Sequence, residues 1–398
     1  MTKAENHLIK IIKENINILF FAIISVLGLA VRIYGLGYMS GDMLYCLIPW
    51  FDEIKAGGGI ASLSAQVGNY SLLYQTIIAL MTYTGLPCIV LYKSVSIVFD
   101  YLLAYAAAAL VCEYKGKPKM SPLFCGIYAL ILFLPTVIMN SAYWGQCDSI
   151  YTFFLVLTLK NMYNKKYPAA FIYYGLAFSF KLQSVFILPF IICLYFARKD
   201  FSMLYGALSF AVFMLSGTAA YLNGRSLLAP FTIYVGQTND FGFLQFNFPS
   251  FWTLIGSMNV ICFKYLSILM TVAVCGMGMY AVISGKNRIG TAEGFYGTAV
   301  WFIWSILLFL PSMHERYAYP LDIMLICLSF FNVKYIKYAV LSAAYSVLTY
   351  GVSIILTAQD FSLTPNLTYN HALISVLAWV FFTYEILNAK TNDQHKSR

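Results

Sequence analysis

The chain has 398 residues, of which 61% are hydrophobic and 18% aromatic, whereas only 10% are charged. Soluble proteins carry about 25% charged residues, so this composition excludes an ordinary water-soluble globule. Apolar stretches long enough to cross a bilayer follow one another along the whole chain. They predict an all-α polytopic membrane protein with one integral-membrane domain over residues 1–398.

The formal charge of +9 does not indicate a nucleic-acid partner, because of how the basic residues are distributed. Most of the Lys and Arg residues lie in short clusters between apolar stretches, and such clusters are typical of cytoplasmic connections. The charge therefore predicts topology, with the lipid bilayer as the partner. The clusters lie at residues 3–13, 115–119, 160–166, 197–199, 285–288, 333–337 and 390–398.

This pattern predicts a multi-pass protein of the plasma membrane with about twelve spans (a range of roughly 11–13) and both termini in the cytoplasm. The first apolar run lacks a small-residue cleavage site, so we interpret it as a retained helix. The expected spans are 16–35, 90–113, 121–141, 149–163, 168–181, 184–197, 203–222, 263–284, 294–311, 317–333, 336–356 and 370–389.

The first external loop is expected over residues 36–87. Within it, residues 43–55 can form an amphipathic helix with Leu44, Ile48, Phe51 and Ile54 on one side. Residues 70–87 are apolar enough to cross, but a crossing there would invert every later basic cluster. We therefore expect 70–87 to form an embedded, re-entrant or juxtamembrane element, or else a span that is compensated by an error elsewhere in the topology.

Asp42 precedes the amphipathic segment of this loop, and two roles fit it. A carboxylate at that place can act as a general base toward a hydroxyl nucleophile. It can also be the N-cap of the following helix, because Asp caps free backbone amides well. Asp52 lies on the polar side of the same segment and is the spare candidate for the base.

Two later external loops are short and polar. The loop WGQCDS contains Trp144, Gln146 and Asp148, and the loop FKLQS contains Lys181 and Gln183. Polar and ionisable residues this close to helix ends at a membrane indicate a functional site. Asp148 would also serve as the cap of a helix that begins at residue 149.

Residues 223–262 form a large external loop rich in aromatic side chains, including Asn247 and Trp252 among its polar and aromatic members. Such side chains favour the headgroup level of a bilayer, and they could also shape an acceptor groove. The next external loop, PSMHERYAYP, contains three consecutive ionisable residues. His314 could hydrogen-bond a phosphate, an acceptor or a neighbouring loop, and Glu315 could orient Arg316 through a bidentate pair.

Three cations are expected near the external face. Arg316, Lys181 and Arg32, which ends the first span, are the candidates. A transporter or flippase of lipid-linked sugars is the alternative, and Lys93, Asp100 and Glu293 are the residues that could mark a transport path. The nine cysteines are scattered through apolar runs and predict neither a disulfide framework nor a zinc site.

Taken together, these motifs resemble a family. Asp42 after the first span, WGQCDS, FKLQSVFILP, QFNFPSFW and PSMHERYAYP, in this order, look like the prokaryotic relatives of the GPI mannosyltransferases, within the GT-C superfamily of membrane glycosyltransferases. The resemblance spans roughly residues 30 to 320.

The resemblance implies a GT-C-like fold with an external active site and an inverting transfer of a hexose, with mannose favoured. The donor would be a polyprenyl-phosphate sugar, and the acceptor a cell-envelope glycan, a glycolipid or a protein. The three cations would stabilise the phosphate as it gains negative charge. The polar residues of WGQCDS and FKLQS would hydrogen-bond sugar hydroxyls, and the Trp144 indole would stack on a sugar face. An acidic residue of the first external loop would be the catalytic base, which maps onto Asp42. Because Gly41 precedes Asp42 where some members have an acidic pair, no cofactor is predicted and dependence on a divalent metal stays open.

Overall fold

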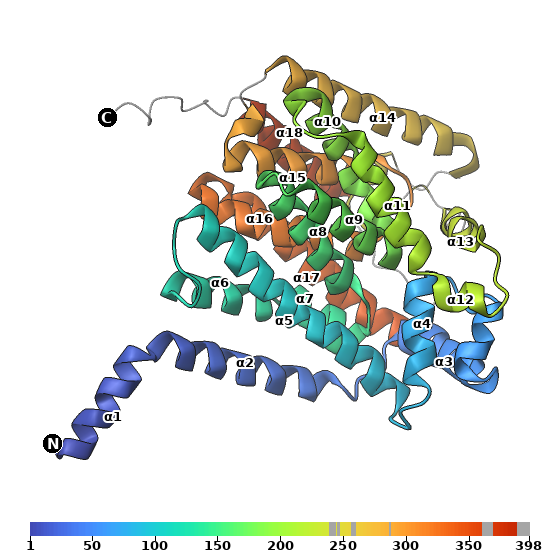
Figure 1. The fold of residues 1–398 in the computed structure, drawn as a ribbon. Coiled ribbons are helices and arrows are strands. Elements are labelled where there is room, and N and C mark those ends of the chain that lie inside the picture. Colours follow the sequence, from blue (N-terminus) through green and yellow to red (C-terminus); the bar gives the residue numbers. More distant parts are fainter. Residues whose placement is uncertain (239–243, 245–246, 256–259, 286–287, 360–368, 388–398) are drawn as a thin grey trace.

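The computed structural model describes the chain except for residues 239–243, 245–246, 256–259, 286–287, 360–368 and 388–398. All regular elements in these described ranges are helical (Figure 1). Helices are expected in a membrane because they satisfy every backbone hydrogen bond within one segment. The prediction of an all-α fold is confirmed.

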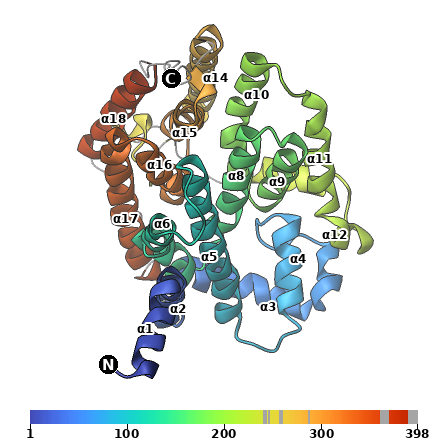
Figure 2. The same ribbon diagram turned by 60° about the vertical axis from the view of Figure 1, so that its left-hand side comes forward.

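The chain begins with two helices at the edge of the molecule. Helix α1 (Lys3–Glu14) extends away from the bundle, and α2 (Ile16–Gly35) follows it (Figure 2). Helix α2 is apolar, but only 11% of its most apolar 18-residue window is buried, so most of its surface faces outward. It packs on the bundle through Gly28, where an added Cβ would lie 2.6 Å from Leu132.

The first external loop folds into short helical pieces: π-helix η1 (Met43–Leu47), α3 (Ile48–Ala56), η2 (Gly59–Ser64) and α4 (Leu72–Met81). The π-helical turn changes the register, so Met43 and Leu47 are buried and Leu44 is 45% exposed. The expectation that Leu44 shares one side of the helix with Phe51 and Ile54, which are buried, is therefore wrong. Helix α4, with ten residues, is about 15 Å long and too short to cross a bilayer.

Helices α5 to α9 form one side of the core. Their bounds are α5 (Cys88–Tyr114), α6 (Pro122–Leu132), α7 (Pro135–Ile138), π-helix η3 (Met139–Trp144), α8 (Asp148–Tyr163) and α9 (Tyr167–Phe180). The segment from α6 to η3 is bent by 54° between residues 132 and 135. Pro135 lies in the first turn after the bend, where proline is favoured.

The second half wraps around α15 (Ala292–Phe309), in which 94% of the residues are buried. The indole of Trp301 donates to Thr383 and that of Trp379 to Ser305, which joins α15 to α18. The other elements are η4 (Leu182–Ile187), α10 (Leu188–Arg198), η5 (Met203–Tyr205), α11 (Gly206–Leu215), α12 (Thr218–Leu222), α13 (Ala229–Gln237), η6 (Phe251–Leu254), α14 (Val260–Ser284), η7 (Arg288–Gly290), η8 (Glu315–Ala318), α16 (Tyr319–Phe331), η9 (Val333–Tyr335), α17 (Ile336–Gln359) and α18 (Tyr369–Leu387).

Six of the described helices are long and apolar enough to cross a membrane, or seven if the bent pair counts as one span. The fold is therefore that of a helical membrane protein. In the described residues each of the twelve expected segments is mainly helical, but several helices are shorter than a span requires, such as α9 with 14 residues and α16 with 13. The number of spans stays a prediction.

The basic clusters at residues 160–166, 197–199 and 333–337 lie at one end of the bundle. Lys160 pairs with Glu113 at 2.8 Å, Lys334 pairs with Glu293 at 2.8 Å, and Arg198 lies over the ring of Phe295 at 4.9 Å. Helix α8 runs from the opposite end, at Asp148, to this basic end, a distance of about 24 Å for its 16 residues. The polar loops near Asp148 are thus separated from the basic loops by the length of a helix.

Candidate active site

The loop that carries Asp42 is held by a buried lysine. The ammonium of Lys93, in α5, donates to the backbone carbonyls of Gly35 (3.0 Å), Leu36 (3.1 Å) and Tyr38 (2.6 Å). The last carbonyl groups of a helix such as α2 have no partners within the helix, and a cation there also suits the helix dipole. Lys93 therefore fixes the path of the chain from α2 toward Asp42.

The π-helices η1 and η3 meet beside Asp42. The hydroxyl of Ser40 donates to the carbonyl of Trp144 (2.9 Å) and accepts from the amide of Met43 (3.2 Å). Gly145 follows η3 with φ +77°, and a Cβ added there would lie 2.6 Å from Met43 Cε. Glycine permits both this backbone conformation and this close approach. The first external loop and WGQCDS are thereby brought together.

The carboxylate of Asp42 receives two hydrogen bonds on one oxygen. Its Oδ2 accepts from Gln146 Nε2 at 2.5 Å and from Arg316 Nη1 at 3.0 Å. The hydroxyl of Tyr70 donates to the other side of the Gln146 amide, at 3.4 Å. Asp42 itself has helical backbone angles and makes no capping bond, so the N-cap interpretation is wrong. Among the described residues, none donates a hydrogen bond to Oδ1 of Asp42.

A second ion pair lies beside the first. Lys181 donates to Asp148 Oδ1, and Asn140 donates to Asp148 Oδ2 at 2.9 Å. Helix α8 begins at Asp148 itself, and the side chain of Asn140 accepts from the Asp148 amide, so the interpretation of Asp148 as a cap is also wrong. The ammonium of Lys181 lies 5.5 Å from the ring centre of Tyr151 and 5.8 Å from that of Tyr317.

The Arg316 guanidinium is held with most of its hydrogen-bonding capacity unused. It lies over the ring of Trp144, 5.5 Å from its centre, and its only hydrogen bond within the described chain goes to Asp42. Its Nε is buried and has no described acceptor. Burial alone would lower the pKa of Arg316, but the Asp42 carboxylate raises it overall, so the group stays a cation.

His314 and Glu315 form a pair of their own. His314 Nδ1 lies 2.6 Å from Glu315 Oε2. Burial lowers the pKa of His314, although Glu315 acts in the opposite direction. Burial would raise the pKa of Glu315, but His314 lowers it overall. The expected bidentate pair between Glu315 and Arg316 is therefore wrong, because Arg316 bonds to Asp42 instead.

These groups surround a cavity of about 300 Å³, which is at the lower end of the range for ligand pockets, about 300–1,000 Å³. Gln146, Lys181, Gln183 and Arg316 line it, and the buried Oε1 of Gln183 has no described donor. No Asp or Glu is among its described lining residues. The cavity therefore has a cationic wall, with Asp42 and Asp148 directly behind it.

Other predicted site residues do not line this cavity. Arg32 is fully buried and bonds to Asp100 at 2.8 Å, since α2 packs against α5 and turns the side chain inward. Asp52 is exposed on α3. Trp252 is buried and donates to the Phe309 carbonyl at 2.7 Å. Asn247 is buried, and His314 is held by Glu315; both lie outside the lining. Trp144 is buried beneath Arg316, which occupies a ring face expected for a sugar.

The sequence prediction missed several residues of the site. Tyr70 bonds to Gln146, Asn140 bonds to Asp148, and Lys264 lines the cavity. Tyr70 begins the apolar segment 70–87, for which the sequence predicts only a place in the membrane. Asn140 is a lone amide inside an expected span, and a polar residue there is a signal that could have identified it.

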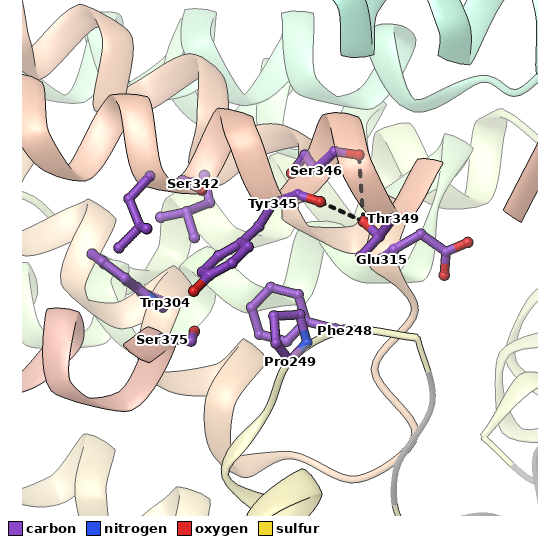
Figure 3. A pocket seen from close by; sticks show the side chains of 11 residues that line it. Phe248, Pro249, Trp304, Glu315, Ser342, Tyr345, Ser346, Thr349 and Ser375 are labelled. Atoms are coloured by element: carbon purple, nitrogen blue, oxygen red, sulfur yellow. Dashed lines mark hydrogen bonds between the residues drawn. The ribbon is translucent and has the colours of Figure 1, made fainter. Parts of the chain in front are cut away.

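A second, smaller cavity lies behind Glu315 between α15, α16, α17 and α18 (Figure 3). Its volume is about 20 Å³, enough for about one water molecule. Hydroxyl side chains line it, and in Figure 3 the Thr349 hydroxyl donates to the backbone carbonyls of Tyr345 and Ser346. This cavity is too small for a sugar.

Within the described residues, no three His, Cys, Asp or Glu side chains are grouped so that they could hold a metal ion. The candidate site therefore consists of two carboxylate–cation pairs, two amides and aromatic rings around one cavity. Neither a scan against protein-family models nor a search of curated proteins found a match to this chain.

Proposed function

We propose that this chain is an inverting glycosyltransferase of the external membrane face that uses a polyprenyl-phosphate sugar as donor. The proposal includes a GT-C-like architecture of about twelve spans with both termini in the cytoplasm. It rests on the resemblance of the sequence motifs and on the chemistry of the cavity. A hexose, with mannose favoured, would pass to a cell-envelope glycan, a glycolipid or a protein.

One observation carries the proposal: the Arg316 guanidinium lines the cavity with most of its hydrogen-bond donors unused. A guanidinium has five donors in a fork that matches phosphate and carboxylate groups. Arg316 uses one of them in the described chain, faces the cavity and leaves a buried Nε without an acceptor. An unsatisfied buried donor costs about 1–3 kcal/mol, so an anionic ligand that accepts from it would be favoured.

The proposed step uses the two ion pairs together. An acceptor hydroxyl gives its proton to Oδ1 of Asp42 while its oxygen bonds to the anomeric carbon of the donor sugar. The bond between that carbon and the phosphate oxygen breaks, and its electron pair leaves with the phosphate as a monoester. Arg316 and Lys181 stabilise the charge that develops on this phosphate. Attack opposite the leaving group inverts the anomeric centre.

The surroundings of the cavity suit a donor with a lipid chain. Lys264 and Ile268 of α14 line the cavity, and the same helix presents Tyr265, Leu266 and Leu269 to the exterior. In a membrane protein, exposed apolar side chains of this kind face lipid. A donor could thus keep its chain in the bilayer while its phosphate reaches the cationic wall.

A transporter or flippase of lipid-linked sugars is less well supported. Buried charges along a transport path should face a cavity. Asp100 is instead bonded to Arg32, Lys93 to backbone carbonyls, and Glu293 to Lys334 at the basic end. None of these residues is among the described lining of the cavity.

The test is to incubate the purified protein in lipid nanodiscs with a panel of polyprenyl-phosphate sugars and glycan acceptors. The proposal predicts release of polyprenyl phosphate and a product with inverted anomeric configuration for at least one sugar. Movement of intact donor across a liposome membrane without bond cleavage would favour the flippase. No release with any donor would contradict the transferase.

A further inference from the structure

We propose that α1 lies on the anionic surface of the bilayer and binds it through an apolar face, with the three lysines of its polar side adding electrostatic attraction. This inference is independent of the proposed transferase. None of the residues of α1 is buried against the rest of the chain. A helix with a large apolar face cannot remain in water at no cost, so a partner for that face is expected.

The apolar residues of α1 gather on one side, where Glu5 separates Ile12 from Ile9. At the helical spacing of three or four residues, Ala4, Leu8, Ile11 and Ile12 fall on one side. Leu8 is 57% exposed and Ile11 44% exposed. Ile9 extends the apolar face at its border. This face is wide enough to enter the boundary between headgroups and acyl chains, which lies about 5–10 Å into the bilayer surface.

The charges of α1 fit an anionic surface. Lys3, Lys10 and Lys13 lie on the side opposite Leu8, as their spacing of seven and three residues requires. The acidic residues are engaged within the helix: Glu5 forms a capping box with Thr2, and Glu14 pairs with Lys10 at 3.9 Å. The positive-inside pattern places this helix on the cytoplasmic side, where acidic lipids are common.

The position of α1 in the fold supports the same partner. It continues into α2, an apolar helix that is long enough to cross the membrane. The chain turns at Asn15, whose side chain donates to the Ile11 carbonyl at 2.9 Å, and α1 then points away from the bundle (Figure 1). A helix that is attached to a span and leaves it at an angle reaches the headgroup layer before any other partner. A bilayer surface is therefore the partner we assign.

Hydrogen exchange of the full chain in nanodiscs tests this inference. We expect the amides of residues 3–14 to exchange more slowly in nanodiscs that contain phosphatidylglycerol than in zwitterionic ones. Added salt should reduce the difference, because exposed charges are screened. Removing one lysine charge should weaken the lipid-dependent protection about fivefold. Exchange in the buried helix α15 serves as the control for folding.

Two sets of variants separate the contribution of the lysine charges from that of the apolar face of α1. A protein with Lys3→Gln, Lys10→Gln and Lys13→Gln should lose the difference between the two lipids. A protein with Leu8→Gln and Ile12→Gln should lose protection in both. Equal exchange of wild-type α1 in both lipids would overturn the proposal. Protection that rises with protein concentration but not with anionic lipid would also overturn it, because a second copy of the chain would then be the partner.

Discussion

Arg316 connects the two sides of the site, because it pairs with the proposed base and also faces the cavity. In the proposed reaction, this arrangement would let one guanidinium pair with Asp42 and also receive a phosphate. The pairing also orients the guanidinium before any ligand arrives, which lowers the cost of ordering it on binding. The ring of Trp144 packs against the guanidinium and holds it in the same position.

Replacing Arg316 distinguishes the effect of its positive charge from that of its planar geometry. Arg316→Lys keeps a cation but loses the planar fork, so we expect turnover to fall by about 10–100-fold. Arg316→Ala should reduce turnover further, since Asp42 also loses its ionic partner. The rate of polyprenyl phosphate release measures both effects, with thermal unfolding as the control for folding. Full turnover by Arg316→Ala would show that the loop at residues 311–320 only connects two helices and does not bind the donor.

The pair of His314 and Glu315 predicts how stability depends on pH. Burial lowers the pKa of His314 from its ordinary value of 6.5, so below pH 6.5 the unfolded chain binds a proton that the folded chain does not. Stability should therefore fall as the pH drops from 7 to 5. The lowered pKa of Glu315 adds a further loss below pH 4.5.

Thermal unfolding of wild type and His314→Gln between pH 7 and 5 measures this effect. The variant should depend less on pH across that window, and His7→Gln, on the exposed helix α1, is the matched control. An equal pH dependence in all three proteins would show that His314 does not contribute.

At this scale, the sequence located the polar residues better than their partners. Six predicted site residues lie around or directly behind one cavity, because all of them adjoin helix ends on the same side of the bundle. They are Asp42, Gln146, Asp148, Lys181, Gln183 and Arg316. Arg32 also adjoins such an end, yet its partner Asp100 is 68 residues away. Pairings over such separations depend on helix packing, which one sequence does not specify.

At the scale of elements, the site depends on the contact between η1 and η3. π-Helical turns are rare and often occur at functional sites. Here they lie directly after Asp42 and directly before Gly145. The sequence correctly predicted a helical segment after Asp42, but helical periodicity assumes 3.6 residues per turn and so misplaced Leu44.

Gly145→Ala tests this contact. The left-handed backbone costs a non-glycine residue about 1–2 kcal/mol, and the new Cβ would also press on Met43. Gly85→Ala is the matched control, because Gly85 has φ +69° and nothing within 4 Å of the added Cβ. We expect both variants to lose some thermal stability but only Gly145→Ala to lose turnover. Equal turnover in the two would mean that the contact does not position Asp42.

At the scale of the whole molecule, buried charges hold helices together inside the bundle. Arg32 and Asp100 are both fully buried, and Arg32 also donates to the carbonyls of Gly28 and Leu132. Ser141 donates to the same carboxylate at 2.5 Å. The pair therefore joins α2, α5, α6 and η3, the elements that lead to both halves of the site.

Breaking this pair should cost more than removing it. Asp100→Asn leaves the buried guanidinium without its counter-ion, and we expect a loss of about 3–5 kcal/mol of stability. The double variant Arg32→Met, Asp100→Leu should be more stable than Asp100→Asn, because no charge remains buried. Thermal unfolding in detergent compares them. A double variant less stable than the single one would contradict this account.

The sequence was sufficient to predict the fold class but not the number of membrane spans. Composition alone predicted the all-helical membrane fold, and the basic clusters predicted which loops share an end. The number of spans stays open because η3, η4 and the bend after α6 interrupt apolar runs, and hydropathy does not detect such breaks. Residues 239–243 of the large external loop lie outside the described part of the chain, so predictions for them are untested.

The central claim is that Asp42 takes the proton of the acceptor, and its most direct test compares Asp42→Asn with Asp52→Asn. Both aspartates belong to the first external loop, but Asp42 bonds to Gln146 and Arg316 of the cavity lining, whereas Asp52 is exposed on α3. General-base catalysis contributes about 10²–10⁴-fold, so Asp42→Asn should lower the rate of polyprenyl phosphate release by that factor. Asp52→Asn should react like wild type. Equal rates for Asp42→Asn and wild type would contradict the assignment of Asp42 as the base.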